Sequence, residues 1–167
     1  MSPIARALAL AGAALLLLTA PGMSTAAMAA TASTGGGVPQ TGLKTVPLTI
    51  QTATGKHRFT VEVAATPEQQ QIGMMYRRTM AADHGMLFPF ATPRVLTFWM
   101  ENTWLPLDLV FIGADGRVVS VAADAKPMSR DPITSSGPAL TVLELNGGAA
   151  ARIGVRPGDK VSFKLPR

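Results

Sequence analysis

Short apolar runs that are rich in β-branched and aromatic residues recur along the chain from residue 46 onward, with turn residues between them. Runs of roughly four to eight residues have the length of β-strands and are too short for most helices. The runs cover residues 46–50, 57–64, 86–90, 95–100, 107–112, 118–122, 140–145 and 160–165. This pattern predicts a mainly β domain of the α+β class, in which an antiparallel sheet is curled toward a barrel.

Two short helices complete the predicted fold. The sequence TPEQ at residues 66–69 has the residues of a capping box, with a proline in the first turn, and it marks where the first helix begins. We expect this helix to reach Tyr76, with Gly73 weakening its interior. A second helix is predicted over residues 149–153, where Gly154 follows at the position that commonly ends a helix.

Residues 1–29 have the parts of a cleaved secretory signal. Arg6 supplies the positive start, a short apolar segment follows, and residues 27–29 form a cleavage site of the A-x-A type. The apolar segment is shorter than the roughly 20 residues that span a membrane. Residues 30–44 are rich in Thr, Ser and Gly and are predicted to be a flexible leader before a single domain at 45–167. We therefore expect a periplasmic or secreted protein with no membrane span after cleavage.

The chain contains no cysteine, so disulfide bonds are excluded and the domain has to be held together by its core. Its formal net charge is +5, and Arg77-Arg78 is the only pair of adjacent basic residues. Nucleic-acid-binding faces need many clustered basic side chains to neutralise phosphates. We therefore expect no nucleic-acid partner, and we expect a monomer whose charge serves solubility.

Polar side chains interrupt the apolar stretch at residues 98–112, FWMENTWLPLDLVFI. Residues 101–106 are predicted to connect two strands, because Asn102 and Thr103 form a natural turn pair and Pro106 fixes the backbone before the next strand. This interpretation explains the polar residues of the connection without any chemistry. The alternative is a binding surface at the same place.

A ligand-binding surface is the first functional hypothesis for this connection. An exposed aromatic ring beside amides and a carboxylate can stack on a sugar ring or hold a peptide. The candidate residues are Trp99, Glu101, Asn102, Thr103 and Trp104. The predicted function is an exported binding or accessory module of the cell envelope for a small ligand, a saccharide or a peptide, with no catalytic cofactor.

Asp108 is the one anomaly that turn chemistry does not explain. On a strand over 107–112, Asp108 shares one face with Val110 and Ile112, which are apolar. A buried carboxylate needs hydrogen-bond donors or a cation. The backbone N–H groups of the 102–103 turn and the Arg77-Arg78 pair are its candidate partners. Asp108 is therefore either a structural strut or part of a site.

An envelope hydrolase or lyase is the alternative function, with Asp108 or Glu144 acting beside His84. Acid–base catalysis requires two such groups to converge within hydrogen-bond reach. The sequence contains no Gly-x-Ser-x-Gly elbow, no cysteine nucleophile and no His-Glu-x-x-His motif, so no catalytic residue is assigned. Because its histidines are only two and isolated, the chain is not expected to bind zinc.

A copper site is a remote alternative. Methionine thioethers are soft ligands that suit Cu(I), and Met86 lies two residues after His84. The closely repeated methionine spacing of such sites is missing here, and methionine also fills irregular cores. We therefore predict no bound metal and no cofactor.

Ten short motifs occur in order along the chain: VEV at 61–63, TPE at 66–68, GMMYR at 73–77, GMLF at 85–88, FWM at 98–100, NT at 102–103, PLD at 106–108, DG at 115–116, VLEL at 142–145 and GD at 158–159. Together they resemble domain-of-unknown-function family 192, a group of small and often exported bacterial and archaeal proteins. The resemblance covers roughly residues 46–165 and implies one compact, mainly β domain. It implies no activity, substrate or catalytic residue. Many members carry lysine where this chain has Glu101, so no cationic role is given to that position.

Overall fold

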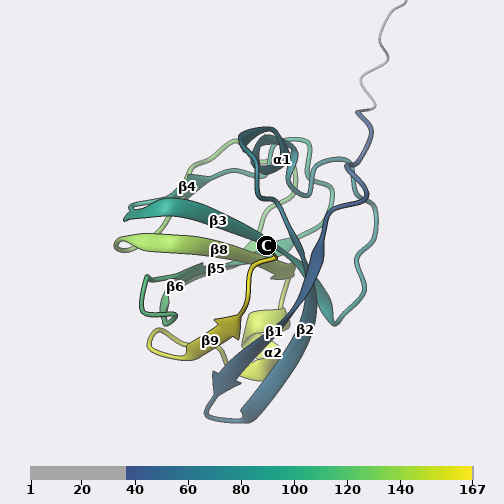
Figure 1. Ribbon diagram of the computed structural model, residues 1–167. Helices are drawn as coiled ribbons and strands as arrows, with labels where there is room; N and C mark the ends of the chain where they lie inside the picture. Colours follow the sequence, from purple (N-terminus) through teal and green to yellow (C-terminus); the bar gives the residue numbers. More distant parts are fainter. Residues whose placement is uncertain (1–36, 167) are drawn as a thin grey trace, which may run out of the picture. The chain divides into compact units, whose positions relative to one another are not determined.

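The computed structural model of the protein describes residues 37–166 (Figure 1). The predicted signal at residues 1–29 and the first part of the predicted leader lie outside the described residues. The described part contains nine strands and two short helices, in the order β1 (Thr45–Thr52), β2 (Gly55–Val63), α1 (Pro67–Ile72), β3 (His84–Arg94), β4 (Thr97–Phe98), β5 (Leu107–Ile112), β6 (Val118–Ala125), β7 (Ile133–Thr134), β8 (Ala139–Asn146), α2 (Ala149–Ile153) and β9 (Lys160–Phe163). Across residues 37–166, no helix has the length and apolar character needed to cross a membrane.

Seven of the strands form one sheet, in the order β6-β5-β8-β3-β2-β1-β9, and the short strands β4 and β7 pair separately. Neighbouring strands are antiparallel except β2 and β3, which run parallel with Thr60 opposite His84. A parallel pair needs a crossover connection, and α1 lies in this one. The prediction of an antiparallel sheet is therefore wrong at this pair, because a helical crossover joins the two strands instead of a hairpin.

The large sheet is not closed into a barrel. The two edges of this sheet come together at one isolated bridge among the described residues, between Arg117 and Lys160, which is not part of a named strand pair. A 2.9 Å hydrogen bond from the Val118 N–H to the Asp159 carbonyl lies beside this bridge. The predicted mainly β class with two short helices is confirmed, whereas the predicted curl toward a barrel is supported only in part.

The core consists of two clusters of apolar side chains, and the central strand β5 contributes to both. Val110 and Ile112 belong to one cluster, while Leu109 and Phe111 belong to the other. All residues of β5 are buried. A strand that is covered on both faces carries a nearly continuous apolar run. The predicted alternation along this strand is confirmed, and it places Asp108 inside the core.

The first helix begins as predicted but ends earlier. Thr66 Oγ1 accepts a 3.3 Å hydrogen bond from the Gln69 N–H, and Gln69 Oε1 accepts a 3.1 Å bond from the Thr66 N–H, so the capping box is confirmed. The helix stops at Ile72, because Gly73 adopts a φ of +48° and donates its N–H to the Gln69 carbonyl. A positive φ favours glycine. Gly73 thus ends the helix, and the predicted extension to Tyr76 is wrong.

The second predicted helix is confirmed as α2. Gly154 follows it with a φ of +73° and donates its N–H to the Ala151 carbonyl at 3.1 Å. At the other end the N-cap is Gly148, which has no side chain that can cap the helix. The first N–H groups of a helix have no partners within it. The start of α2 therefore depends on acceptors from elsewhere in the domain.

The single strand predicted at 95–100 is replaced by a different arrangement. β3 continues to Arg94, with an irregularity in its pairing to β8 after Pro89. Only the two residues of β4 remain from the predicted strand, and they pair with β7, which is equally short. Sequence patterns identify strands of about four residues or more. This small sheet was therefore not predicted.

The described part of the predicted leader contacts the domain. Gln40 Nε2 donates hydrogen bonds to the carbonyl oxygens of Gln69 at 3.0 Å and Gly73 at 2.9 Å, at the end of α1. The Gln40 carbonyl accepts a 3.0 Å bond from the Arg77 guanidinium. The last carbonyl groups of a helix have no partners within it. Gln40 therefore caps α1 from outside the helix.

Candidate functional site

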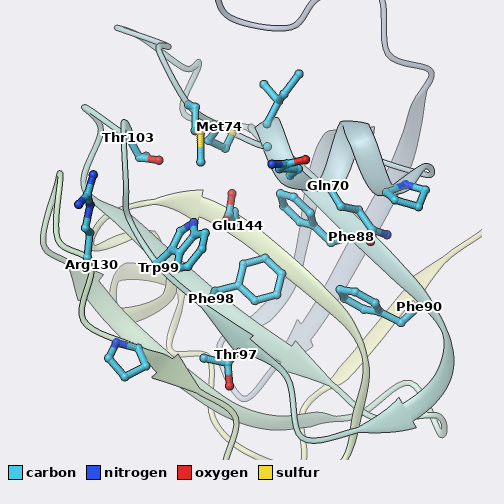
Figure 2. Close-up of a pocket in the computed structure, with 16 residues that line it drawn as sticks. Gln70, Met74, Phe88, Phe90, Thr97, Phe98, Trp99, Thr103, Arg130 and Glu144 are labelled. Atoms are coloured by element: carbon cyan, nitrogen blue, oxygen red, sulfur yellow. The ribbon is translucent and has the colours of Figure 1, made fainter. Parts of the chain in front are cut away.

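A pocket of about 540 Å³ opens beside α1, where β3 and β8 pair (Figure 2). Its walls come from α1 and the turn after it, from β3, β4 and β8, and from the segments that follow β4 and β6. Most of the lining is apolar, and its aromatic side chains are Phe88, Phe90, Phe98 and Trp99. Its polar side chains include Gln70, Thr103, Arg130 and Glu144.

Phe98 is the centre of the aromatic wall. Its ring centroid lies 5.3 Å from that of Phe88 and 6.4 Å from those of Phe90 and Phe111. All these pairs are nearly perpendicular, an edge-to-face geometry that aromatic rings favour. The pairing of β4 with β7 holds the Phe98 backbone in place. The pocket wall is therefore preformed.

Gln70 fixes the opposite wall. Its Nε2 donates hydrogen bonds to the carbonyl oxygens of Ala64 at 3.2 Å and Pro89 at 2.7 Å. These bonds tie α1 to the end of β2 and to β3. Because both amide hydrogens are used, Gln70 is a structural part of the pocket wall.

Glu144 is the buried carboxyl group of the pocket. It lies on β8 opposite Met86 of β3 and Leu109 of β5, and only 4% of the residue is exposed. Burial raises the pKa of Glu144 to about 8, and the positive charge of Arg77 acts in the opposite direction. Among the described residues, Glu144 Oε2 has no hydrogen-bond partner. At neutral pH the carboxyl group is therefore mainly protonated and can donate a hydrogen bond into the pocket.

The structure brings three of the predicted site residues to this pocket. Trp99, Thr103 and Glu144 all line it, and Trp99 is 54% exposed. Sequence analysis missed the wall formed by Phe88, Phe98 and their neighbours. The sequence placed these residues only in strand-like apolar runs, because a cavity leaves no local sequence pattern.

Glu101 and Asn102 have structural roles at the edge of the pocket. Glu101 Oε1 accepts a 2.5 Å hydrogen bond from the guanidinium of Arg130, which lines the pocket. Asn102 adopts a φ of +54°, and its carbonyl accepts the Tyr76 N–H at 2.8 Å. Asparagine tolerates this conformation better than most residues. The predicted turn thus accounts for Asn102.

Trp104 lies apart from the pocket lining. It is 42% exposed, and the guanidinium carbon of Arg78 lies 4.0 Å from its ring centroid. This geometry is a cation–π contact. The predicted surface is therefore divided, with Trp99 at the pocket and Trp104 under an arginine.

Asp108 is completely buried and is bound by backbone N–H groups. Its Oδ1 accepts bonds from Asp124 at 2.7 Å and Gly148 at 3.1 Å, and its Oδ2 accepts one from Ala150 at 2.7 Å. The predicted partners, the 102–103 turn and the Arg77-Arg78 pair, are wrong. The real donors come from β6 and the start of α2, and these follow Asp108 in the chain. The geometry is that of a structural strut.

The predicted catalytic groups do not converge. Asp108 lies opposite Leu145 on β8, whereas Glu144 lies opposite Leu109 on β5, so the two carboxyl groups point to opposite faces of the sheet. His84 is at the surface, where its Nδ1 lies 2.8 Å from Asp83 Oδ1. The hydrogen bond with His84 lowers the pKa of Asp83.

The two residues proposed for a copper site, His84 and Met86, differ in exposure. Met86 is fully buried in the core and lies 3.8 Å from Gln40 Nε2, while the His84 side chain is 46% exposed. Within residues 37–166, no group of three or more His, Cys, Asp or Glu side chains is arranged to hold a metal ion.

Comparison with known proteins identifies similar chains. Residues 49–163 match the DUF192 family, described as Uncharacterized ACR. A crystal structure from Sinorhizobium meliloti 1021, provisionally described as a transcription regulator, has 44% identity and a TM-score of 0.71 over 74% of this chain and 97% of that chain. A protein of unknown function from Novosphingobium aromaticivorans DSM 12444 has 46% identity and a TM-score of 0.72 over 75% and 89%. No curated protein matches the chain at a significant level.

Proposed function

This chain belongs to the DUF192 family, and we propose that it is an exported binding module of the cell envelope whose pocket holds a small ligand. The observation that supports this most is the pocket of about 540 Å³, in which aromatic rings surround one buried carboxyl group. Sites for small molecules commonly have volumes of about 300 to 1,000 Å³, mostly apolar walls and a few polar groups. The pocket has all three properties.

The walls favour a compact ligand with an apolar body and one polar group. Phe98 and Trp99 offer ring surfaces for the body, and Glu144 offers a hydrogen bond for the polar group. One side chain of a short peptide fits this description, whereas a saccharide ring, which carries several hydroxyl groups, matches it only through the face that stacks on Trp99. An extended peptide fits less well, because the pocket beside α1 is compact and a peptide of several residues needs a long groove.

The proposed location is the periplasm or the medium, and the proposed form is a monomer. The location rests on residues 1–29, which resemble a cleaved signal, and the monomer rests on the net charge of the chain, which serves solubility. When the full chain is expressed with its native start, we expect intact-mass measurement of the exported protein to give a start near residue 30. A protein that keeps residues 1–29 and stays inside the cell contradicts export.

The binding proposal is tested by a thermal-shift screen of the mature protein against cell-wall fragments, oligosaccharides, short peptides and small aromatic compounds. A ligand that binds the native state raises the melting temperature, and the rise grows with the logarithm of its concentration once this exceeds Kd. We expect Trp99→Ala to remove the shift and Trp104→Ala to keep it. Both residues are partly exposed tryptophans, but only Trp99 lines the pocket. A shift that survives Trp99→Ala and Phe98→Ala places the ligand elsewhere and contradicts the proposal.

A further inference from the structure

Glu144 is an unusual residue for its position in the sheet. On β8 it shares a face with Val142, and its cross-strand neighbours Met86 and Leu109 are apolar. A carboxyl group in such surroundings is costly unless it is hydrogen-bonded or paired. Glu144 Oε2 is nevertheless without a partner among the described residues. Figure 2 shows its carboxyl group among Trp99, Phe98 and Phe88, on the pocket side of β8.

The positive groups near Glu144 are already paired with other carboxylates. Arg77, whose charge acts on Glu144, forms an ion pair with Glu62 through Nη1, while its buried Nε has no hydrogen-bond partner among the described residues. Arg130 lines the pocket and forms its ion pair with Glu101. Ionisation of Glu144 therefore leaves a negative charge in the pocket that these two pairs do not neutralise.

The aromatic lining adds to this preference for positive charge. The face of an aromatic ring is negative and attracts cations, most strongly for tryptophan. Phe88, Phe98 and Trp99 line the same pocket as Glu144. Recognition of organic ammonium groups by aromatic cages uses this combination. An anionic ligand gains nothing from these ring faces and is repelled when Glu144 is ionised, and Arg130, the cation of the lining, is already paired with Glu101.

We infer that the pocket recognises an organic cation, an ammonium or quaternary ammonium group on an apolar body, with its charge against Glu144 and its alkyl groups against Phe98 and Trp99. This inference rests on the proposed function, because it names the ligand class of the same pocket. It also gives a reason for a buried carboxyl group beside aromatic rings. The ligand supplies the positively charged partner that Glu144 lacks.

Cation binding is expected to displace the proton of Glu144. Burial raises the pKa of Glu144 to about 8, so most of the carboxyl is protonated at neutral pH. A bound cation favours the ionised form. Arg77 is the charged group that acts on Glu144, and Arg130 lines the same pocket; arginine keeps its charge throughout this range. The affinity for a quaternary ammonium ion, which has no proton to lose, is therefore expected to rise with pH through about 8.

The experiment uses three probes of one shape. They are choline, the neutral alcohol in which a tert-butyl group replaces its trimethylammonium group, and the carboxylate that carries the same tert-butyl group. Titration calorimetry on the mature protein measures the affinity of each. We expect choline to bind about tenfold or more tightly than the neutral alcohol at pH about 9, and the carboxylate to bind most weakly.

Two variants test whether Glu144 and Trp99 cause the preference for choline over the alcohol. Glu144→Gln keeps the shape of the side chain and removes its ability to ionise, so we expect it to lose the preference for choline over the alcohol. Trp99→Leu keeps an apolar wall at an exposed position and removes the ring. We expect this variant to weaken choline several-fold and the alcohol by a smaller factor, because the alcohol loses contact area but no cation–π attraction.

The outcomes separate this inference from the proposed function. Equal binding of choline and the alcohol, or a choline preference that survives Glu144→Gln, overturns the cation inference and leaves the pocket as a ligand site. Failure of all three probes at millimolar concentration also overturns the inference. The proposed function is overturned only if the wider thermal-shift screen likewise gives no ligand that depends on Trp99.

Discussion

The Asp108 carboxylate accepts a 2.7 Å hydrogen bond on Oδ2 from the backbone N–H of Ala150. Through this contact β5, the most deeply buried strand of the sheet, caps the first turn of α2. The helix is five residues long, and helices this short are not stable alone. Gly148 has no side chain that can cap α2, and Asp108 on β5 supplies the missing acceptor.

Removal of this acceptor is expected to destabilise the domain. Asp108→Ala leaves the N–H groups of Asp124, Gly148 and Ala150 without their acceptor, and we expect it to lower the free energy of unfolding by about 1 to 3 kcal/mol. Chemical denaturation measures the change. Asp83→Ala removes an exposed carboxylate and serves as the control. Unfolding curves of Asp108→Ala that overlay those of the wild type contradict the structural role.

The stability of the domain should depend on pH through Glu144. Burial raises the pKa of Glu144 from 4.5 to about 8, so between these values the native state holds a proton that the unfolded chain has lost. The free energy of unfolding therefore falls as pH rises across this window, by an amount on the order of a few kcal/mol. We expect Glu144→Gln to reduce this fall and to be more stable than the wild type above pH about 8. Denaturation at a series of pH values measures it.

The matched control for this pH series is Glu101→Gln. Glu101 lies near the same pocket but is paired with Arg130. We expect this variant to keep the slope of the wild type between pH about 5 and 8. If the curves of the wild type and Glu144→Gln stay parallel, Glu144 does not hold the extra proton.

The close approach of β3 and β8 should not tolerate a side chain at Gly85. A Cβ atom there would lie 2.5 Å from the backbone oxygen of Glu144 and 2.9 Å from Leu145 Cδ2. Overpacking against backbone forces strands apart, and we expect Gly85→Ala to cost about 1 to 3 kcal/mol of stability. Gly137→Ala is the control, because its Cβ would meet Val119 at an ordinary 3.5 Å. Equal melting temperatures for both variants contradict this packing.

The contact of Gln40 with α1 is expected to protect the end of that helix. Gln40→Ala leaves the carbonyl groups of Gln69 and Gly73 without the Gln40 amide, and we expect a loss of about 1 kcal/mol. Amide hydrogen exchange should become faster at the Gly73 N–H, which bonds to Gln69. Gln51→Ala removes a glutamine side chain from β1 and should leave α1 unchanged. Unchanged exchange in Gln40→Ala contradicts a capping role.

Local patterns predicted the parts of the fold that local forces determine. The capping box at Thr66, the alternation along β5 and the glycine that ends α2 are all present in the structure. Each depends on residues a few positions apart. The end of α1 was predicted four residues too late (Tyr76 against Ile72), because the positive φ of Gly73 depends on the turn that follows it.

Long-range pairing explains what the sequence analysis did not predict. The parallel pair of β2 and β3, the short strand β7 and the aromatic wall at Phe98 all join distant segments. Asp108 was identified as an anomaly, yet its donors are 16 to 42 residues further along the chain. Trp99 and Thr103 were candidates for one binding surface and Glu144 for acid–base chemistry, and their meeting at one pocket became visible only in the fold.

The parallel pairing of β2 and β3 also sets an order for folding. The hairpin of β1 and β2 closes over a two-residue turn, whereas β3 reaches β2 only after the α1 crossover, and β8 reaches β3 from still further along the chain. Contacts of large sequence separation form slowly, because a long loop must close first. The pocket needs α1, β3, β4 and β8 together. Recovery of ligand binding during refolding is therefore expected to report a late non-local step and to lag behind the appearance of β-structure.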